Sequence, residues 1–285
     1  MLASRPDIAS NPCVGKGGSF GRMKETKEMK VQYLKPGDKI SKYVQEILIL
    51  ENHGVIAPFV LPLFANGMPT LLFQTAKGHI RKNSNYLTLF GQTVFPDTLT
   101  LKEGFTLVAY FLQPHSLISL FGISAQELTD NPIDLNLLSH CKTSNIQEQL
   151  LNAASITQML ELLDNFLFNL ATKITFDITL LQYATNKIVQ NPHHQILREV
   201  QNELYVTERT FQRLFERNIG VSPNQYRRIC QFNNAFQQLN RDRTKSLTEI
   251  TFHNGYADQS HFIRAFREFT SVTPGEFLNY GTISS

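Results

Sequence analysis

A chain of 285 residues, of which 42% are hydrophobic, has the length of two ordinary domains and enough apolar side chains for a core in each. Charged residues make up only 18%, which excludes a broadly disordered chain, and a net charge of +3 does not by itself indicate a nucleic-acid partner. The cysteines Cys13, Cys141 and Cys230 are far apart and lack CxxC spacing, which argues against a disulfide framework or a zinc site.

Neither a membrane span nor an export signal is predicted. The sequence has no run of about eighteen apolar residues, and its first residues lack the apolar stretch of a signal peptide. We therefore expect a cytoplasmic protein with reduced thiols. Residues 1–30 contain Pro, Gly, Ser and Lys without a periodic apolar pattern, which predicts a flexible tail.

Short strand-like runs follow this tail. Between residues 31 and 112, segments rich in β-branched and aromatic residues alternate with Gly and Pro, a pattern typical of short strands joined by turns. The clearest runs are 47–50, 70–73, 86–90 and 105–111. The pattern predicts a small β-barrel or sandwich, and we assign residues 31–145 to this β-rich domain.

The apolar period then changes to that of helices. Ser155 and Gln158 form a capping-box pattern that opens an amphipathic helix over residues 155–172. A second helix is predicted from its cap Asp177 to about residue 190, where Asn-Pro ends it. Residues 146–190 are therefore assigned to a helical linker. The apolar face of its first helix fits equally a second copy of the chain or the chain's own β-domain.

The remaining residues, 191–285, contain an internal repeat. A shift of 51 residues places Phe211 on Phe262 and Arg213 on Arg264. The same shift, taken without a gap, gives the further pairs Ile196 and Leu247, Tyr205 and Tyr256, and Pro223 and Pro274. So many matched pairs at one offset indicate a duplicated structural unit.

Each copy of the repeat predicts two helices joined by a tight turn. In the first copy, a helix over residues 196–204 precedes a helix capped by Thr207. In the second copy, a helix over residues 247–253 is followed by a turn at Gly255 and a helix capped by Asp258. The second helix of each copy has Phe at a spacing that buries one face.

The outer face of these second helices carries Arg and Gln side chains. Arg donates two hydrogen bonds to guanine and Gln bonds both ways with adenine, so these residue types suit a helix in the major groove of DNA. Basic residues beside them suit phosphate contacts. We expect these at Arg217, Arg227, Arg228, Arg243, Lys245, His261 and Arg267. A plain helical bundle with solvated arginines is the alternative, which the matched Arg213 and Arg264 disfavour.

Three segments of this region closely resemble the AraC/XylS family of transcription regulators. They are residues 211–215 (Phe-Gln-Arg-Leu-Phe), 220–223 (Gly-Val-Ser-Pro), and 255–266 with 272–274 (Gly-Tyr-Ala-Asp-Gln-Ser-His-Phe-Ile-Arg-Ala-Phe and Val-Thr-Pro). The resemblance spans residues 193–280 and implies two helix-turn-helix units, joined by a long helix, that enter the major groove about 34 Å apart. By position it implies base reading by Arg209, Gln212, Arg213, Gln259, Ser260 and Arg264.

Two features depart from the family pattern. Gln201 and Thr251 stand where the first helix of each unit usually has a small Ala, and Ser271 stands where Gly commonly precedes Val-x-Pro. A residue other than Gly in a left-handed cap costs about 1–2 kcal/mol. We therefore expect the second unit either to end differently or to be less stable.

In this family an N-terminal β-rich domain commonly senses a small molecule or mediates dimerisation. The resemblance implies a cupin-like barrel here, whose apolar pocket would be lined by Phe59, Phe64, Phe73, Phe90 and Phe111, with ordinary core packing as the alternative. A metal-dependent cupin enzyme would need clustered histidines. The histidines of this half of the chain are scattered, at His53, His79, His115 and His140. We therefore expect no catalytic residue, metal or cofactor.

The expected fold class is α+β: a small β-barrel or cupin-like domain, a helical linker, and an all-α domain with two helix-turn-helix units in residues 191–285. The expected function is sequence-specific binding of double-stranded DNA to regulate transcription, under control of an effector in the N-terminal domain. The alternative is a ligand-independent regulator whose N-terminal domain serves dimerisation or protein interaction. RNA polymerase and a second copy of the chain are candidate partners. The direction of regulation stays open.

Overall fold

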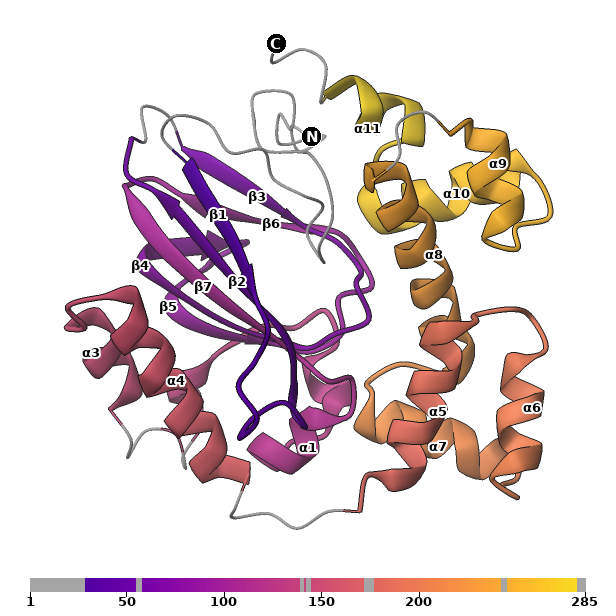
Figure 1. Cartoon of the computed structure of the whole chain (residues 1–285), viewed down its shortest axis with the longest axis horizontal. Coiled ribbons are helices and arrows are strands. Elements are labelled where there is room, and N and C mark those ends of the chain that lie inside the picture. Colours follow the sequence, from indigo (N-terminus) through magenta and orange to yellow (C-terminus); the bar gives the residue numbers. More distant parts are fainter. Residues whose placement is uncertain are drawn as a thin grey trace.

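The computed structural model shows a β-sheet domain beside a helical domain (Figure 1). It describes residues 29–54, 58–138, 141, 145–171, 177–241 and 245–280. Most of the predicted tail, with Cys13, lies outside these residues, as do His140 and Arg243. The confirmed fold class is α+β, with an antiparallel sheet before the helical domain.

Eight strands of the described chain form one antiparallel sheet, in the order β1-β2-β7-β4-β5-β8, with β6 paired to both β3 and β4. The strands are β1 (Met29–Leu34), β2 (Val44–Asn52), β3 (Phe59–Leu63), β4 (Thr70–Ile80), β5 (Asn83–Phe90), β6 (Asp97–Leu101), β7 (Phe105–Leu112) and β8 (Ile133–Asp134). Closing a barrel requires the end strands to pair. Here β1 pairs only with β2, and the two-residue β8 only with β5. Of the two expected forms, barrel or sandwich, the sheet is therefore not closed into a barrel.

Strand β7 is buried on both faces, which explains why all but Thr106 of its residues are apolar or aromatic. Alternate side chains, such as Leu107 and Phe111, point into the apolar layer between the main sheet and the β3–β6 pair. The others, such as Val108 and Tyr110, belong to a second core that includes α4. Successive strand side chains point to opposite faces, so one strand serves two cores.

Helices α1 (Ser116–Phe121), α3 (Ile146–Leu151) and α4 (Ile156–Ala171) pack against the sheet, together with short 3₁₀ turns at Ala125–Leu128 (η2) and Leu135–Leu137 (η3). The side chains that α4 buries are Met159, Leu163, Phe166, Leu167 and Leu170. The apolar face of the predicted 155–172 helix is therefore covered by the chain's own β-domain. This was one of the two alternatives, the other being a second copy of the chain.

The N-terminus and middle of α4 are fixed by polar contacts. The Ser155 hydroxyl accepts from the backbone N–H of Gln158 at 3.2 Å, as the capping-box pattern predicts. Further along, the Tyr110 hydroxyl donates to an Asp164 oxygen at 2.6 Å. Burial, together with this carboxylate, raises the pKa of Tyr110 well above its usual value, so the hydroxyl remains a donor.

Seven helices build the second domain within the described residues: α5 (Thr179–Gln190), α6 (Ile196–Glu203), α7 (Glu208–Asn218), α8 (Pro223–Arg241), α9 (Leu247–His253), α10 (Gln259–Thr270) and α11 (Pro274–Tyr280). They share one core rich in buried aromatic rings. Its fully buried phenylalanines are Phe211, Phe215, Phe232, Phe236, Phe262, Phe266 and Phe269. Helix α5 contributes Leu181, Ala184 and Ile188 to it. The two helices of the predicted linker thus pack in different domains.

The first helix-turn-helix unit contacts the sheet domain through hydrogen bonds and apolar side chains. The Thr129 hydroxyl donates to the Gly220 carbonyl at 2.7 Å, just after α7, and Ser124 donates to the Arg217 carbonyl at 3.3 Å. Phe64, which follows β3, lies in the helical core with its ring 5.7 Å from that of Phe236. The apolar core of the helical domain therefore includes a part of the sheet domain.

His115, between β7 and α1, makes stability sensitive to acid. It is 1% exposed, neither ring nitrogen has a hydrogen-bond partner among the described residues, and burial, with a smaller effect of Lys42, lowers its pKa to about 4. The unfolded chain protonates this group near its ordinary pKa of about 6.5, so its contribution is complete above that pH. As pH falls from about 6.5 to about 4, the unfolded chain binds a proton that the folded chain does not, and we expect a loss of up to roughly 3 kcal/mol.

Urea unfolding of the full chain between about pH 7.5 and about pH 4 measures this effect. His115→Phe keeps a buried ring without a titrating group, and its stability should fall less over that range than that of the wild-type chain. His53→Gln is the matched control, because His53 is exposed. Equal pH dependence in the wild-type and His115→Phe chains would contradict the assignment.

Candidate nucleic-acid interface

The first unit places α6 and α7 around a short turn. The Thr207 hydroxyl accepts from the backbone N–H of Thr210 at 3.3 Å and so caps α7, as predicted. Phe211 and Phe215 point into the core. The opposite face of α7 therefore lies at the surface. Its side chains are those that fall between the buried phenylalanines in the sequence.

Arg209, Gln212 and Arg213 are all exposed on α7. The Gln212 amide donates to Glu216 at 2.8 Å, whereas neither arginine has an ion pair within the described ranges. Two uncompensated guanidinium groups and one adaptable amide on a single exposed helix face match the hydrogen-bond donors and acceptors of base edges in a major groove.

The second unit repeats this arrangement with stronger caps. Ser246 and Glu249 form a reciprocal capping box at α9, and an Asp258 oxygen accepts from the His261 N–H at 2.7 Å at the start of α10. The predicted readers Gln259, Ser260 and Arg264 are exposed. The Gln259 amide donates to the Thr248 hydroxyl at 2.6 Å and the Arg264 Nε to the Ser260 carbonyl at 3.3 Å. Both side chains must break these hydrogen bonds before they can bond to a base.

The turns correct the gapless alignment of the two units. Tyr205 (φ 53°) and Gly255 (φ 71°) are the left-handed residues of the two turns. The next residue in each case donates back to the preceding helix, Val206 to Gln201 and Tyr256 to Thr251, both at 3.1 Å. The first helix and turn are therefore related by 50 residues, and the caps onward by 51, because the second turn contains one additional residue, Ala257. The pairs Tyr205 with Tyr256 and Ile196 with Leu247, both taken at a shift of 51 before the cap, were therefore wrong.

Ser271 ends α10 in the left-handed conformation, with φ 66°. At the matched position after α7 stands Gly220, with φ 99°. Ser271→Gly should therefore stabilise the chain by about 1 kcal/mol, since Gly adopts this conformation without the steric cost of a Cβ. Urea unfolding measures the gain, and Ser84→Gly, at an exposed position of β5 with ordinary backbone, is the control that should show none. A loss of stability would show that the Ser side chain compensates for its backbone.

The residues expected to contact phosphate fall into two groups. Four of them, Arg217, Lys245, His261 and Arg267, are exposed. The other two described ones hold the domain together. Arg228 forms an ion pair with Glu268 of α10 at 2.6 Å, and Arg227 donates to the Pro192 carbonyl at 3.1 Å. Burial lowers the pKa of Arg227. These two guanidinium groups are engaged within the protein, a use that the sequence pattern did not indicate.

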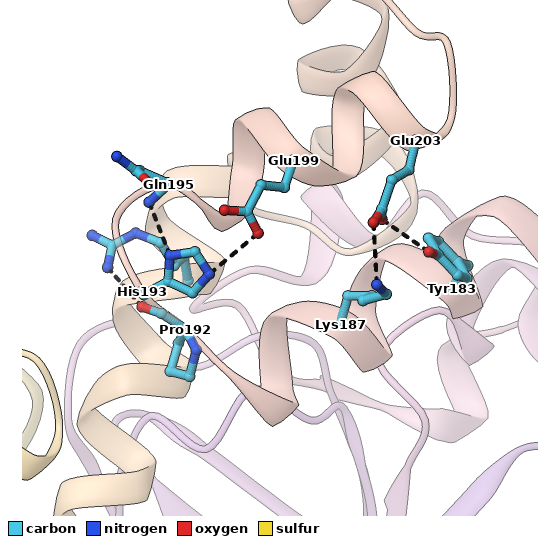
Figure 2. Close-up of polar contacts among 8 residues, drawn as sticks. Tyr183, Lys187, Pro192, His193, Gln195, Glu199 and Glu203 are labelled. Atoms are coloured by element: carbon cyan, nitrogen blue, oxygen red, sulfur yellow. Dashed lines mark hydrogen bonds and ion pairs between the residues drawn. The ribbon is translucent and has the colours of Figure 1, made fainter.

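The acidic side chains of α6 are also engaged (Figure 2). Glu203 accepts from the Tyr183 hydroxyl at 2.8 Å and forms an ion pair with Lys187 at 3.2 Å, and these two contacts lower its pKa. Glu199 lies 3.4 Å from the His193 Nε2. Lys187 of α5 thereby offsets negative charge on the first unit, which reduces repulsion of a polyanion.

The five phenylalanines expected to line one pocket lie in three different cores. Phe59, Phe90 and Phe111 belong to the layer between the strands, Phe73 to the core under α4, and Phe64 to the helical core. All five are buried. The structure therefore does not bring them together around a common space.

A polar cavity of about 390 Å³ lies instead between the two domains. Strands β1 and β2, the β3–β4 and β7–α1 connections, and helices α5 and α8 all line it. Its carboxamide side chains are Gln45, Asn66, Gln113, Asn186, Asn233, Asn234 and Gln237. Burial raises the pKa of Glu46 at its wall, against the opposing effects of Lys35 and Arg241. No sequence signal marks this cavity, because its lining is assembled from distant segments and lacks a spacing of its own.

In the described part of the chain, no three His, Cys, Asp or Glu side chains gather in a way that would hold a metal ion. Cys141 and Cys230 are both buried. No helix found there has both the length and the apolar character needed to cross a membrane.

Residues 200–280 match the model of a helix-turn-helix domain, and residues 32–134 match a domain of unknown function, DUF6597. The chain is 25% identical over 163 residues to a probable transcriptional regulator, LumQ, of Photobacterium leiognathi, covering 57% of this chain and 58% of that protein. It is 32% identical over 81 residues to the HTH-type transcriptional regulator ArgR of Pseudomonas aeruginosa, covering 28% and 24%. It thus spans less than two thirds of these relatives. The crystal structure of ToxT from Vibrio cholerae matches with 13% identity, 90% and 99% coverage and a TM-score of 0.45.

Proposed function

We propose that this chain, a member of the AraC/XylS family through its C-terminal domain, binds specific sites on double-stranded DNA and regulates transcription. The observation that carries the proposal is the presence of two capped recognition helices, α7 and α10, on one shared aromatic core, with Arg213 and Arg264 exposed at matched positions. Two such helices read two successive stretches of the major groove. We propose no catalytic role, and a cytoplasmic site of action where DNA is accessible.

The experiment is selection of bound sequences from a random DNA library by the full chain, followed by titration of the selected site and a scrambled site. We expect the selected site to bind at least about 10³-fold tighter. Affinity should fall steeply with salt, because bound Arg and Lys release counterions from the phosphates. Absence of any enriched sequence would contradict the proposal.

The polar cavity favours a second element of this function, control by a small molecule. A ligand that fills it would contact β2 on one side and α8 on the other, and α8 connects the two helix-turn-helix units. Binding would therefore favour one relative placement of sheet domain and reading helices over others. We propose this cavity as the effector site. A regulator whose sheet domain serves only dimerisation or contact with RNA polymerase is the alternative.

Thermal-shift screening of the full chain against a metabolite library tests the effector proposal. A true effector should raise Tm in the wild-type chain, and Asn233→Ala, in the cavity wall, should reduce that rise. Asn83→Ala, on an exposed part of β5, is the matched control. A ligand whose effect is unchanged by Asn233→Ala binds elsewhere.

A further inference from the structure

Tyr205 is an unusual residue for the turn of the first unit. It adopts a left-handed conformation with φ 53° and its side chain is 96% exposed. No hydrogen bond or ring contact joins this side chain to the rest of the described chain. A large aromatic side chain in contact with solvent over nearly its whole surface adds nothing to the core.

The backbone at Tyr205 is strained for a residue with a side chain, since a Cβ meets the following carbonyl oxygen in the left-handed region. The second unit adopts the same conformation with Gly255, which has no Cβ. The fold itself would therefore be better served by Gly at position 205. Strain that a matched turn avoids points to a use of the side chain outside the fold.

The location of Tyr205 indicates that use. It lies two residues before the Thr207 cap and four before Arg209, at the end of α7 that carries the exposed readers. A recognition helix contacts bases with this end, and the helix before it crosses the DNA backbone, so the turn between the two helices comes close to the phosphates. A tyrosine hydroxyl is one of the side-chain donors that proteins use for phosphate oxygens.

We propose that the Tyr205 hydroxyl donates a hydrogen bond to a DNA phosphate at the border of the groove that α7 enters. This contact fixes the depth and angle of α7 and thus positions Arg209 and Arg213 over the bases. The inference rests on the proposed function, because it requires the first unit to bind DNA.

Two substitutions separate this role from a structural one. Tyr205→Phe keeps the ring and the backbone and should weaken binding to the selected site about tenfold, the typical effect of losing a hydrogen bond to a charged group. Because a hydroxyl releases no counterion, the slope of affinity against salt should stay unchanged. Tyr205→Gly should raise Tm by several degrees through relief of strain, and yet weaken DNA binding.

The control is Tyr183→Phe, since Tyr183 is another exposed tyrosine of the same domain, bonded to Glu203. Replacing single phosphates of the selected site by neutral methylphosphonates should reveal one position at which Tyr205→Phe causes no further loss. The inference would be overturned if Tyr205→Phe bound the selected site with wild-type affinity. It would also be overturned if Tyr205→Phe caused the same further loss of affinity at every methylphosphonate position. If Arg213→Ala weakens binding while Tyr205→Phe does not, only this inference fails. If the wild-type chain selects no DNA, the proposed function fails and the inference with it.

Discussion

Replacing Arg213 or Arg264 by alanine should weaken binding to the selected DNA site by about 1–3 kcal/mol each, and relax the base preference at one position of that site. Both guanidinium groups are exposed on matched faces of α7 and α10. Arg213 has no ion pair in the described ranges, whereas Arg264 must first release the Ser260 carbonyl. We therefore expect the larger loss for Arg213. Fluorescence anisotropy on the selected site and on its single-base variants measures both effects.

Lys102→Ala provides the matched control, because it removes one exposed positive charge from the sheet domain. It should leave affinity and base preference close to those of the wild-type chain. Circular dichroism of each variant must show an unchanged helix content. An unchanged affinity in both arginine variants, with the fold intact, would contradict base reading by these residues and leave only phosphate contacts to explain binding.

Gly220→Ala should destabilise the full chain by roughly 2–4 kcal/mol. Gly220 has φ 99°, a conformation that costs a residue with a side chain about 1–2 kcal/mol. A Cβ there would also lie 2.6 Å from the Thr129 hydroxyl and 2.9 Å from the Ala125 carbonyl, so the contact between α7 and the sheet domain would have to open. Overpacking of this kind adds about 1–3 kcal/mol. Urea unfolding of the full chain measures the loss.

A second-site change identifies the cause of that loss. In the Gly220→Ala background, Thr129→Ala removes the nearest atom and should restore part of the stability, giving a favourable coupling energy in a double-mutant cycle. Gly275→Ala is the matched glycine control, because nothing lies within 4 Å of a Cβ at that position in α11. Additive effects of the two substitutions would show that backbone strain alone is responsible.

The sequence predicted those features of the fold and site that depend on neighbouring residues. The caps Thr207 and Asp258 and the helix at Leu247–His253 were all predicted in place, because each depends on a few adjacent side chains and on the spacing of Phe. At Ser271, where the family pattern commonly has Gly, two outcomes were open, and the helix ends there in the left-handed conformation. The exposure of the predicted base-reading residues followed from the same periodicity.

Features that depend on distant pairing were not predictable. Whether the sheet closes depends on β8, which is too short and too polar to be recognised as a strand. The difference of one residue between the two turns is hidden because Tyr205 and Tyr256 share a residue type. Arg228 looks like a phosphate contact until Glu268, forty positions further along the chain, is brought to it. The polar cavity requires both domains to be in place.

The presence of Phe64 and Ala65 in the helical core has a consequence for how such chains can be recombined. The residues that match the helix-turn-helix model, 200–280, include neither this pair nor α5. A segment excised at those limits would keep α7 and α10 but expose the rings of Phe236 and its neighbours to water, which favours aggregation. The part of the chain that shares one folded core is therefore larger than residues 200–280, which match the helix-turn-helix model. A chimera that exchanges DNA-binding specificity should graft the outer faces of α7 and α10 and leave the underlying core with its original sheet.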